Sequence, residues 1–199
     1  MSVPVSRVPS TSPSRQKRIL VFAGEFATTE GDRWLLDDIV DEFLLQGARV
    51  DVLVFDNKRP RPRGVTTGKN GQLRTISVGP ESAPQGATAK LSGRLKAALL
   101  MHTVAYRILS REVYDFAVFT SVGSVTAGLP WRLRACGIVK RLIFVLWDFF
   151  PIHQMEIGRL PSHRIVNLLR HIEYLNFSNA DSVAVMSLSI GDPPLPRLP

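Results

Sequence analysis

The chain alternates between short apolar runs and longer segments whose apolar residues recur at helical spacing. The short runs predict β-strands and the longer segments predict amphipathic helices. The predicted strands are residues 17–23, 49–55, 73–78, 114–121 and 182–186, together with an apolar run that starts at Leu142 and ends before Trp147. The predicted helices are residues 33–46, 89–111, 125–136 and 162–178. This alternation predicts an α/β fold with a single Rossmann-like, doubly wound, mostly parallel six-stranded sheet.

The first predicted helix, residues 33–46, has one apolar side and one acidic side. Asp32 is suited to cap its start, and Gly47 is suited to follow its end. The acidic side is expected to be a solvated surface. It consists of Asp37, Asp38, Asp41 and Glu42. Further along the chain, residues 56–72 are predicted to form a basic loop.

Length and composition indicate one domain. The chain has 199 residues, of which 45% are hydrophobic, and this is enough for one buried core. The domain is expected to span residues 17–188, with disordered tails at residues 1–16 and 189–199. The 25 basic residues outnumber the 17 acidic ones, which favours anionic partners. Cys136 is the single cysteine, so an internal disulfide is excluded.

The predicted helix 89–111 is apolar on two sides. One stripe, which includes Leu99, Tyr106 and Leu109, is interpreted as core. The other side is apolar among basic residues, so the helix either lies on an anionic membrane surface or is buried by protein on both sides. The residues expected to face a membrane are Lys96, Leu100, Val104, Arg107 and Arg111.

No membrane-spanning segment is predicted, because no stretch approaches the ~18 uninterrupted apolar residues that a span needs. The first residues contain no apolar core of a secretory signal. The protein is therefore expected in the cytoplasm, with any membrane contact limited to the periphery at the inner face of the cell membrane.

Several familiar motifs are absent. No G-x-G-x-x-G follows the first predicted strand, and no G-x-S-x-G is present. Gly68-Lys69 is followed by Asn70 and does not join a strand to a helix, so a phosphate-binding loop is rejected. The four histidines form no metal-ligand pair at helical spacing, and no metal site is predicted.

Polar residues follow three of the predicted strands at their carboxyl ends, where open α/β sheets bind ligands. The first group is Gly24-Glu25-Phe26, where backbone N–H groups could approach an anion; the alternative is a tight strand-to-helix turn. The second group contains Ser121 and Ser124, which could hold a phosphate or a sugar hydroxyl, or could cap a helix.

The third group is Trp147 and Asp148 with His153 and Gln154. A carboxylate beside an aromatic ring suits sugar binding, because sugar rings stack on aromatic faces and carboxylates accept hydrogen bonds from hydroxyls. In the alternative reading Asp148 caps the turn and Trp147 fills the core. The position at a strand's carboxyl end favours the binding role.

Residues 146–159, with the sequence LWDFFPIHQMEIGR, resemble the N-terminal half of bacterial capsular and O-antigen glycosyltransferases of family 4. The segment Asn179-Ala180-Asp181 and the strand that follows it, VAVMS, resemble the same family. The resemblance implies half of a GT-B fold, which is built from two Rossmann-like domains. It also implies sugar transfer from a nucleotide-sugar, with retention of configuration, to a saccharide that is often carried on polyprenyl phosphate.

In this family the N-terminal domain binds the acceptor and the C-terminal domain binds the donor. The resemblance therefore implies no metal and no cofactor, with the nucleotide-sugar as co-substrate. Wider relatives carry His-Asp where this chain has Trp147-Asp148, so the catalytic residue is unknown and Asp148 and His153 are the candidates. The family's E-x7-E pair is not found in the sequence. The chain is expected to be truncated or naturally short, and inactive alone.

A second hypothesis is a non-catalytic membrane-surface or scaffold subunit that pairs with a separate donor-binding chain. The helix 89–111 and the loop 56–72 motivate it. Nucleic-acid binding rests on charge alone, and the basic residues lack interleaved aromatics, which argues against it.

Overall fold

The structure is a computed structural model that describes residues 15–27, 33, 35–54, 64–78, 99–104, 106–120, 128–146, 151–158 and 163–185. A seven-stranded sheet in the order β3-β4-β2-β1-β5-β6-β7 lies at its centre. The strands are β1 (Arg18–Ala23), β2 (Arg49–Val54), β3 (Gly64–Gly68), β4 (Leu73–Ser77), β5 (Phe116–Thr120), β6 (Leu142–Leu146) and β7 (Ser182–Val185). The helices are α1 (Leu35–Leu45), α3 (Leu129–Ala135), α4 (Ile152–Glu156) and α5 (His163–Asn179), and residues 99–104 and 106–109 are also helical.

β1 occupies the middle of the sheet. It pairs in parallel with β2 on one side and with β5 on the other. Its last five residues are buried, which explains why the strand is apolar without alternation. From β1 the chain moves outward to β2 and β4, then crosses to β5 and continues to β6 and β7 on the other side. The gap between β1 and β5 is therefore the topological switch point, where sheets of this kind bind ligands.

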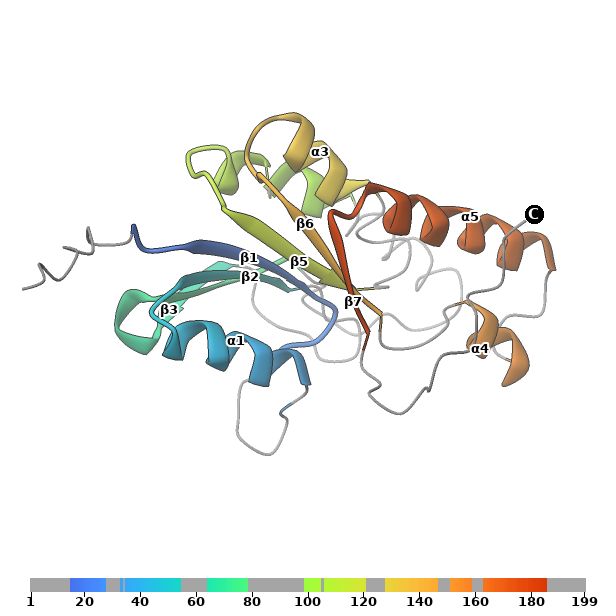
Figure 1. Cartoon of the computed structure of the whole chain (residues 1–199), viewed down its shortest axis with the longest axis horizontal. Coiled ribbons are helices and arrows are strands. Elements are labelled where there is room, and N and C mark those ends of the chain that lie inside the picture. The colour runs from blue at the N-terminus through green and yellow to red at the C-terminus, as the bar shows by residue number, and fades with distance from the viewer. Residues whose placement is uncertain are drawn as a thin grey trace, which may run out of the picture.

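Helices cover both faces of the sheet (Figure 1). α1 lies on one face, where Val40 packs in the same cluster as Val21 of β1. The other face is covered by α3 through Leu133 and by the helical segment that contains Met101. α5 covers the same face, and its Phe177 ring lies 5.3 Å from the ring of Phe144 in β6. The predicted α/β fold with a mostly parallel sheet is confirmed.

The prediction of six strands is wrong by one. β3 lies within the segment predicted to be a basic loop, and it pairs antiparallel with β4. The chain turns between the two strands at Lys69 and Asn70, whose φ angles are 49° and 55°. Asn-Gly is a strong hairpin signal, but the Val-Thr-Thr run before it was too short to be recognised as a strand. Gly68-Lys69 thus belongs to a hairpin and not to a strand-to-helix phosphate loop.

The helical residues 99–104 and 106–109 bury part of each apolar side. Leu109, predicted as core, is fully buried. Met101 is fully buried, and Val104 packs against the same core cluster. Leu99 and Tyr106, predicted as core, are 64% and 43% exposed. Tyr106 instead lies beside α3, with the Arg132 guanidinium 5.3 Å from its ring. Periodicity could not choose between two apolar stripes on one helix.

This orientation changes the expected membrane-facing set. Val104 faces the core and Leu100 is half-buried, whereas Arg107 and Arg111 are exposed. Lys96 lies outside the described residues. In the part of the chain that the structure describes, no helix has the length and apolar character needed to cross a membrane.

A buried charge network joins β2, β4 and the residues before β5. Asp51 of β2 is 1% exposed and lies opposite Arg74 of β4. The Arg74 guanidinium donates to both Asp51 carboxylate oxygens, one of them at 3.0 Å, and the Tyr114 hydroxyl donates to the same carboxylate. Burial, reinforced by the charge of Asp51, raises the pKa of Tyr114, so this hydroxyl keeps its proton. Without these partners the Asp51 charge could not be buried.

Glu112 extends the network to β1. Its carboxylate pairs with the guanidinium of Arg18, which also lies 5.9 Å from the centre of the Tyr114 ring. The hydrogen bond from Arg18 holds the pKa of Glu112 below its ordinary value of 4.5. The network therefore ties together three strands, β1, β2 and β4, at the amino ends of the sheet.

Replacing Asp51 with Asn keeps the shape of the side chain but removes its charge. The Arg74 guanidinium then loses its nearest counter-ion and keeps only the Glu112 carboxylate, 3.9 Å away, so we expect the free energy of unfolding in urea to fall by about 3 kcal/mol. Asp38→Asn is the matched control, because the Asp38 side chain is 64% exposed, and its effect should stay within about 0.5 kcal/mol. Equal effects of the two substitutions would contradict a stabilising role for the buried pair.

Candidate functional site

Three neighbouring strands, β1, β5 and β6, end together at one edge of the sheet. Val21 pairs with Val118, so Ala23, the last residue of β1, is level with Thr120, the last residue of β5. Thr120 in turn pairs with Val145, one residue before the end of β6. Because adjacent strands are ~4.8 Å apart, the three strand ends lie within about 10 Å of one another. The chain therefore leaves all three strands beside the switch point.

The three groups of polar residues predicted from sequence follow these three strand ends. Gly24, Glu25 and Phe26 come directly after β1 and are described. The groups after β5 and β6 are not described in full, although their starting points are fixed by Thr120 and Leu146. The predicted site residues outside the described part are Ser121, Ser124, Trp147 and Asp148, with the side chains of His153 and Gln154 in α4.

The turn after β1 is anchored at its far end by two neighbouring residues, Phe26 and Ala27. The side chain of Phe26 is buried in the core cluster beneath α1. One residue later, the backbone N–H of Ala27 donates a 2.8 Å hydrogen bond to the carboxylate of Asp37. Gly24 and Glu25, between the strand and this anchor, are half-buried.

Asp37 corrects the prediction of a wholly solvated acidic face on the first helix. It is only 6% exposed, because the first turn of α1 lies against the turn that follows β1. Asp38 and Asp41 lie on the solvent-facing side of α1, and each accepts a 2.7 Å hydrogen bond from Arg33. Sequence reasoning missed the role of Asp37, although an acidic residue in the first turn of a helix is a recognised sign of an N-terminal hydrogen-bonding role.

This edge suits a ligand rich in hydroxyl groups. Glu25 contributes a half-buried carboxylate, and the residues around it belong to a turn that Asp37 holds in place. Carboxylates accept hydrogen bonds from hydroxyls, and a held turn presents its polar groups in a fixed arrangement. Among the described residues, no three His, Cys, Asp or Glu side chains gather in a way that could hold a metal ion.

No protein-family model and no curated protein sequence matches this chain. Among solved structures, an α,α-trehalose-phosphate synthase (UDP-forming) from Burkholderia vietnamiensis has a TM-score of 0.52 at 13% identity, covering 84% of this chain and 39% of that one. The α,α-trehalose 6-phosphate synthase of Burkholderia multivorans, with a TM-score of 0.46 and 13% identity, covers the same shares.

The likeness to the first of these enzymes shows the fold. The chain has the fold of part of a GT-B glycosyltransferase, and it spans about two-fifths of the length of that synthase, 39% by coverage.

The anchoring role of Asp37 can be tested by Asp37→Ala. We expect the backbone N–H of Ala27 to exchange with deuterium at least about tenfold faster, because its charged acceptor is gone. Asp38→Ala, on the same helical turn, is the control and should leave this rate unchanged. If both variants protect Ala27 as the parent protein does, then the Asp37 carboxylate does not hold the turn.

Proposed function

We propose that this chain is the acceptor-binding half of a retaining, nucleotide-sugar-dependent glycosyltransferase of family 4 that acts in cell-surface polysaccharide synthesis. One observation carries the proposal. The family-like segment LWDFFP begins at Leu146, the last residue of β6, so it leaves the sheet at the edge where β1 and β5 also end. The segment with the most specific resemblance therefore starts where a sheet of this topology binds ligands.

The proposed site combines an apolar surface with polar groups. Trp147 offers an apolar face to a sugar ring, and Asp148 and Glu25 accept hydrogen bonds from its hydroxyls. Asp148 and His153 are the candidates for the group that accepts the proton of the acceptor hydroxyl as the glycosidic bond forms. Ser121, Ser124 and Gln154 add further hydrogen-bonding groups around the acceptor.

The chain is proposed to bind an acceptor without catalysing transfer by itself. Sugar transfer requires groups that stabilise the negative charge developing on the departing nucleoside diphosphate. In a GT-B enzyme these groups belong to the donor domain, and the share of the synthase that this chain covers, 39%, is consistent with one of two domains. The nucleotide-sugar would then be held by that second domain, and no metal or cofactor is assigned to this one.

Binding to an array of bacterial polysaccharide fragments tests the acceptor role. We expect the purified chain to bind a subset of saccharides, and Asp148→Asn to weaken that binding by about tenfold or more, because a charge-assisted hydrogen bond is lost. Asp38→Asn, on the exposed side of α1, is the control. No saccharide binding by the folded chain, or equal weakening by both variants, would contradict the proposal.

The proposal that the chain alone does not transfer sugar can be tested with the same purified protein. With a labelled nucleotide-sugar and the bound saccharide, the chain alone should give no transfer. Robust transfer without a partner would show that the donor groups are present after all.

The alternative is a non-catalytic membrane-surface or scaffold subunit that pairs with a separate donor-binding chain. The exposure of Leu99 and Tyr106 beside Arg107 and Arg111 favours it, because apolar and basic side chains together suit an anionic bilayer. Co-sedimentation with phosphatidylglycerol vesicles separates the two proposals. Salt-sensitive binding that survives Asp148→Ala supports the subunit, and no binding at low salt rules out a membrane surface.

A further inference from the structure

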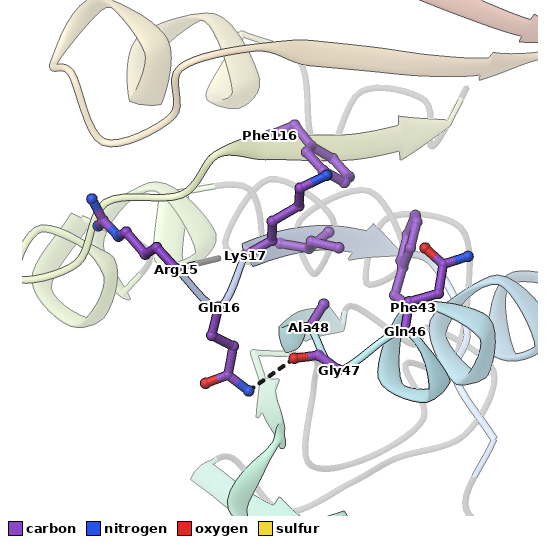
Figure 2. A pocket seen from close by; sticks show the side chains of 9 residues that line it. Arg15, Gln16, Lys17, Phe43, Gln46, Gly47, Ala48 and Phe116 are labelled. Atoms are coloured by element: carbon purple, nitrogen blue, oxygen red, sulfur yellow. Dashed lines mark hydrogen bonds between the residues drawn. The ribbon is translucent and has the colours of Figure 1, made fainter. Parts of the chain in front are cut away.

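A cavity of about 410 Å³ opens at the amino ends of the strands, opposite the edge that carries the proposed acceptor site. Figure 2 shows how three segments surround it: the chain entering β1, the end of α1, and the start of β5. This volume lies within the range of small-molecule sites. The lining residues are Arg15, Gln16, Lys17, Ile19, Phe43, Gln46, Gly47, Ala48 and Phe116.

The wall formed by the end of α1 is fixed by hydrogen bonds. Gly47, with a φ of 78°, turns the chain out of the helix, as its position in the sequence predicted. The N–H groups of Gly47 and Ala48 bond back to the carbonyls of Leu44 and Phe43 at 2.9 and 3.0 Å. The side-chain amide of Gln16 then donates to the Gly47 carbonyl at 2.9 Å (Figure 2). The entering chain and the helix end are therefore joined before any ligand binds.

Two aromatic rings form part of the cavity wall. The rings of Phe43 and Phe116 meet edge to face, with centroids 5.6 Å apart. Ile19 and Ala48 belong to the same core cluster beneath α1. Aromatic and aliphatic surfaces of this kind accept a ring or another compact apolar body.

The rim of the cavity is positively charged. Arg15 and Lys17 are exposed, and neither forms an ion pair with another described residue. Asp115, the acidic residue next to Phe116, is already engaged. Hydrogen bonds from Lys140 and from the backbone N–H of Arg18, with the nearby charge of Arg15, hold the pKa of Asp115 below its ordinary value.

The remaining polar group near the rim is also satisfied. Gln46 donates through its side-chain amide to the carboxylate of Glu42 at 2.8 Å, so this carboxylate is engaged within α1. The rim therefore presents the charge of Lys17 together with that of Arg15, part of which acts on Asp115. A guanidinium and an ammonium together suit a group with several anionic oxygens.

We propose that this cavity binds a small organic phosphate whose apolar part is about the size of one ring. The ring lies against Phe43 and Phe116, and Lys17, whose side chain points toward Phe116 in Figure 2, holds the phosphate. The exposed side chain of Arg15, which points away from the rings, turns toward the phosphate when the ligand binds. β1 separates this site from the acceptor edge by its six residues, or about 20 Å, so the two ligands do not compete for space. The site is thus independent of the proposed acceptor function.

Phenyl phosphate combines the two chemical features, and it serves as the probe. Titration into the 15N-labelled chain should shift the backbone amides of Lys17, Gly47 and Ala48. The double variant Arg15→Gln, Lys17→Gln should weaken phenyl phosphate binding by about tenfold or more, because both cations are removed. Arg170→Gln, which removes an exposed charge on α5, is the control and should leave binding unchanged.

Phe116→Leu separates the apolar part of the site from the charged rim. It should weaken binding of phenyl phosphate while leaving binding of inorganic phosphate unchanged. No shift at Gly47 and Ala48, equal weakening by Arg170→Gln, or inorganic phosphate binding as tightly as phenyl phosphate would each overturn the proposal. The last result would mean that positive charge alone attracts the anion and that the cavity contributes nothing.

Discussion

The parallel pairing of β1 on both of its edges is the constraint on which the rest of this structure depends. A strand that is paired on two sides and covered by helices on both faces must be apolar throughout, and five of its six residues are buried. The same pairing makes the gap between β1 and β5 the switch point of the sheet. Its register brings the ends of β1, β5 and β6 level, so one choice of pairing decides where a ligand can bind.

The two edges of the sheet differ in chemistry. At the amino ends, acidic residues fix the register of neighbouring strands. The carboxylate of Asp115 accepts the N–H of Arg18 at 3.1 Å, and that of Asp181 accepts the N–H of Leu142 at 2.7 Å. The network of Asp51, Arg74 and Tyr114 adds a buried connection between strands near the same edge. The carboxyl ends are thereby left to carry the segments proposed to recognise a saccharide.

Much of the fold could be predicted from the sequence. A short apolar run predicts a buried strand, and a segment with a single apolar side at helical spacing predicts a helix packed on that side. β1 and α1 are examples, and Gly47 ends α1 as its position suggested. The prediction failed where two solutions were equally compatible with the pattern. The segment with Leu99 and Met101 has two apolar stripes, and only packing against the sheet decides that Met101 and Leu109 are buried while Leu99 is exposed.

The candidate site could be placed at an edge of the sheet but not described in detail. The sequence identifies the residues that follow each strand, because they come directly after each predicted strand along the chain. It did not show that Asp37 is turned inward, because a carboxylate on an acidic helix face is usually solvated and only the neighbouring turn provides its donor. The cavity at the opposite edge could not be predicted from the sequence either, since its lining residues Arg15, Gly47 and Phe116 are far apart in the chain.

The central claim is that the carboxyl edge of β1, β5 and β6 binds a saccharide. The most direct measurement is a 15N-edited NMR titration of the chain with a saccharide that it retains on the array. The account predicts shifts at the amides of Gly24, Glu25 and Ala27, with those of Gly47 and Ala48 unchanged. Shifts confined to Gly47 and Ala48, or spread evenly over the sheet, would contradict it.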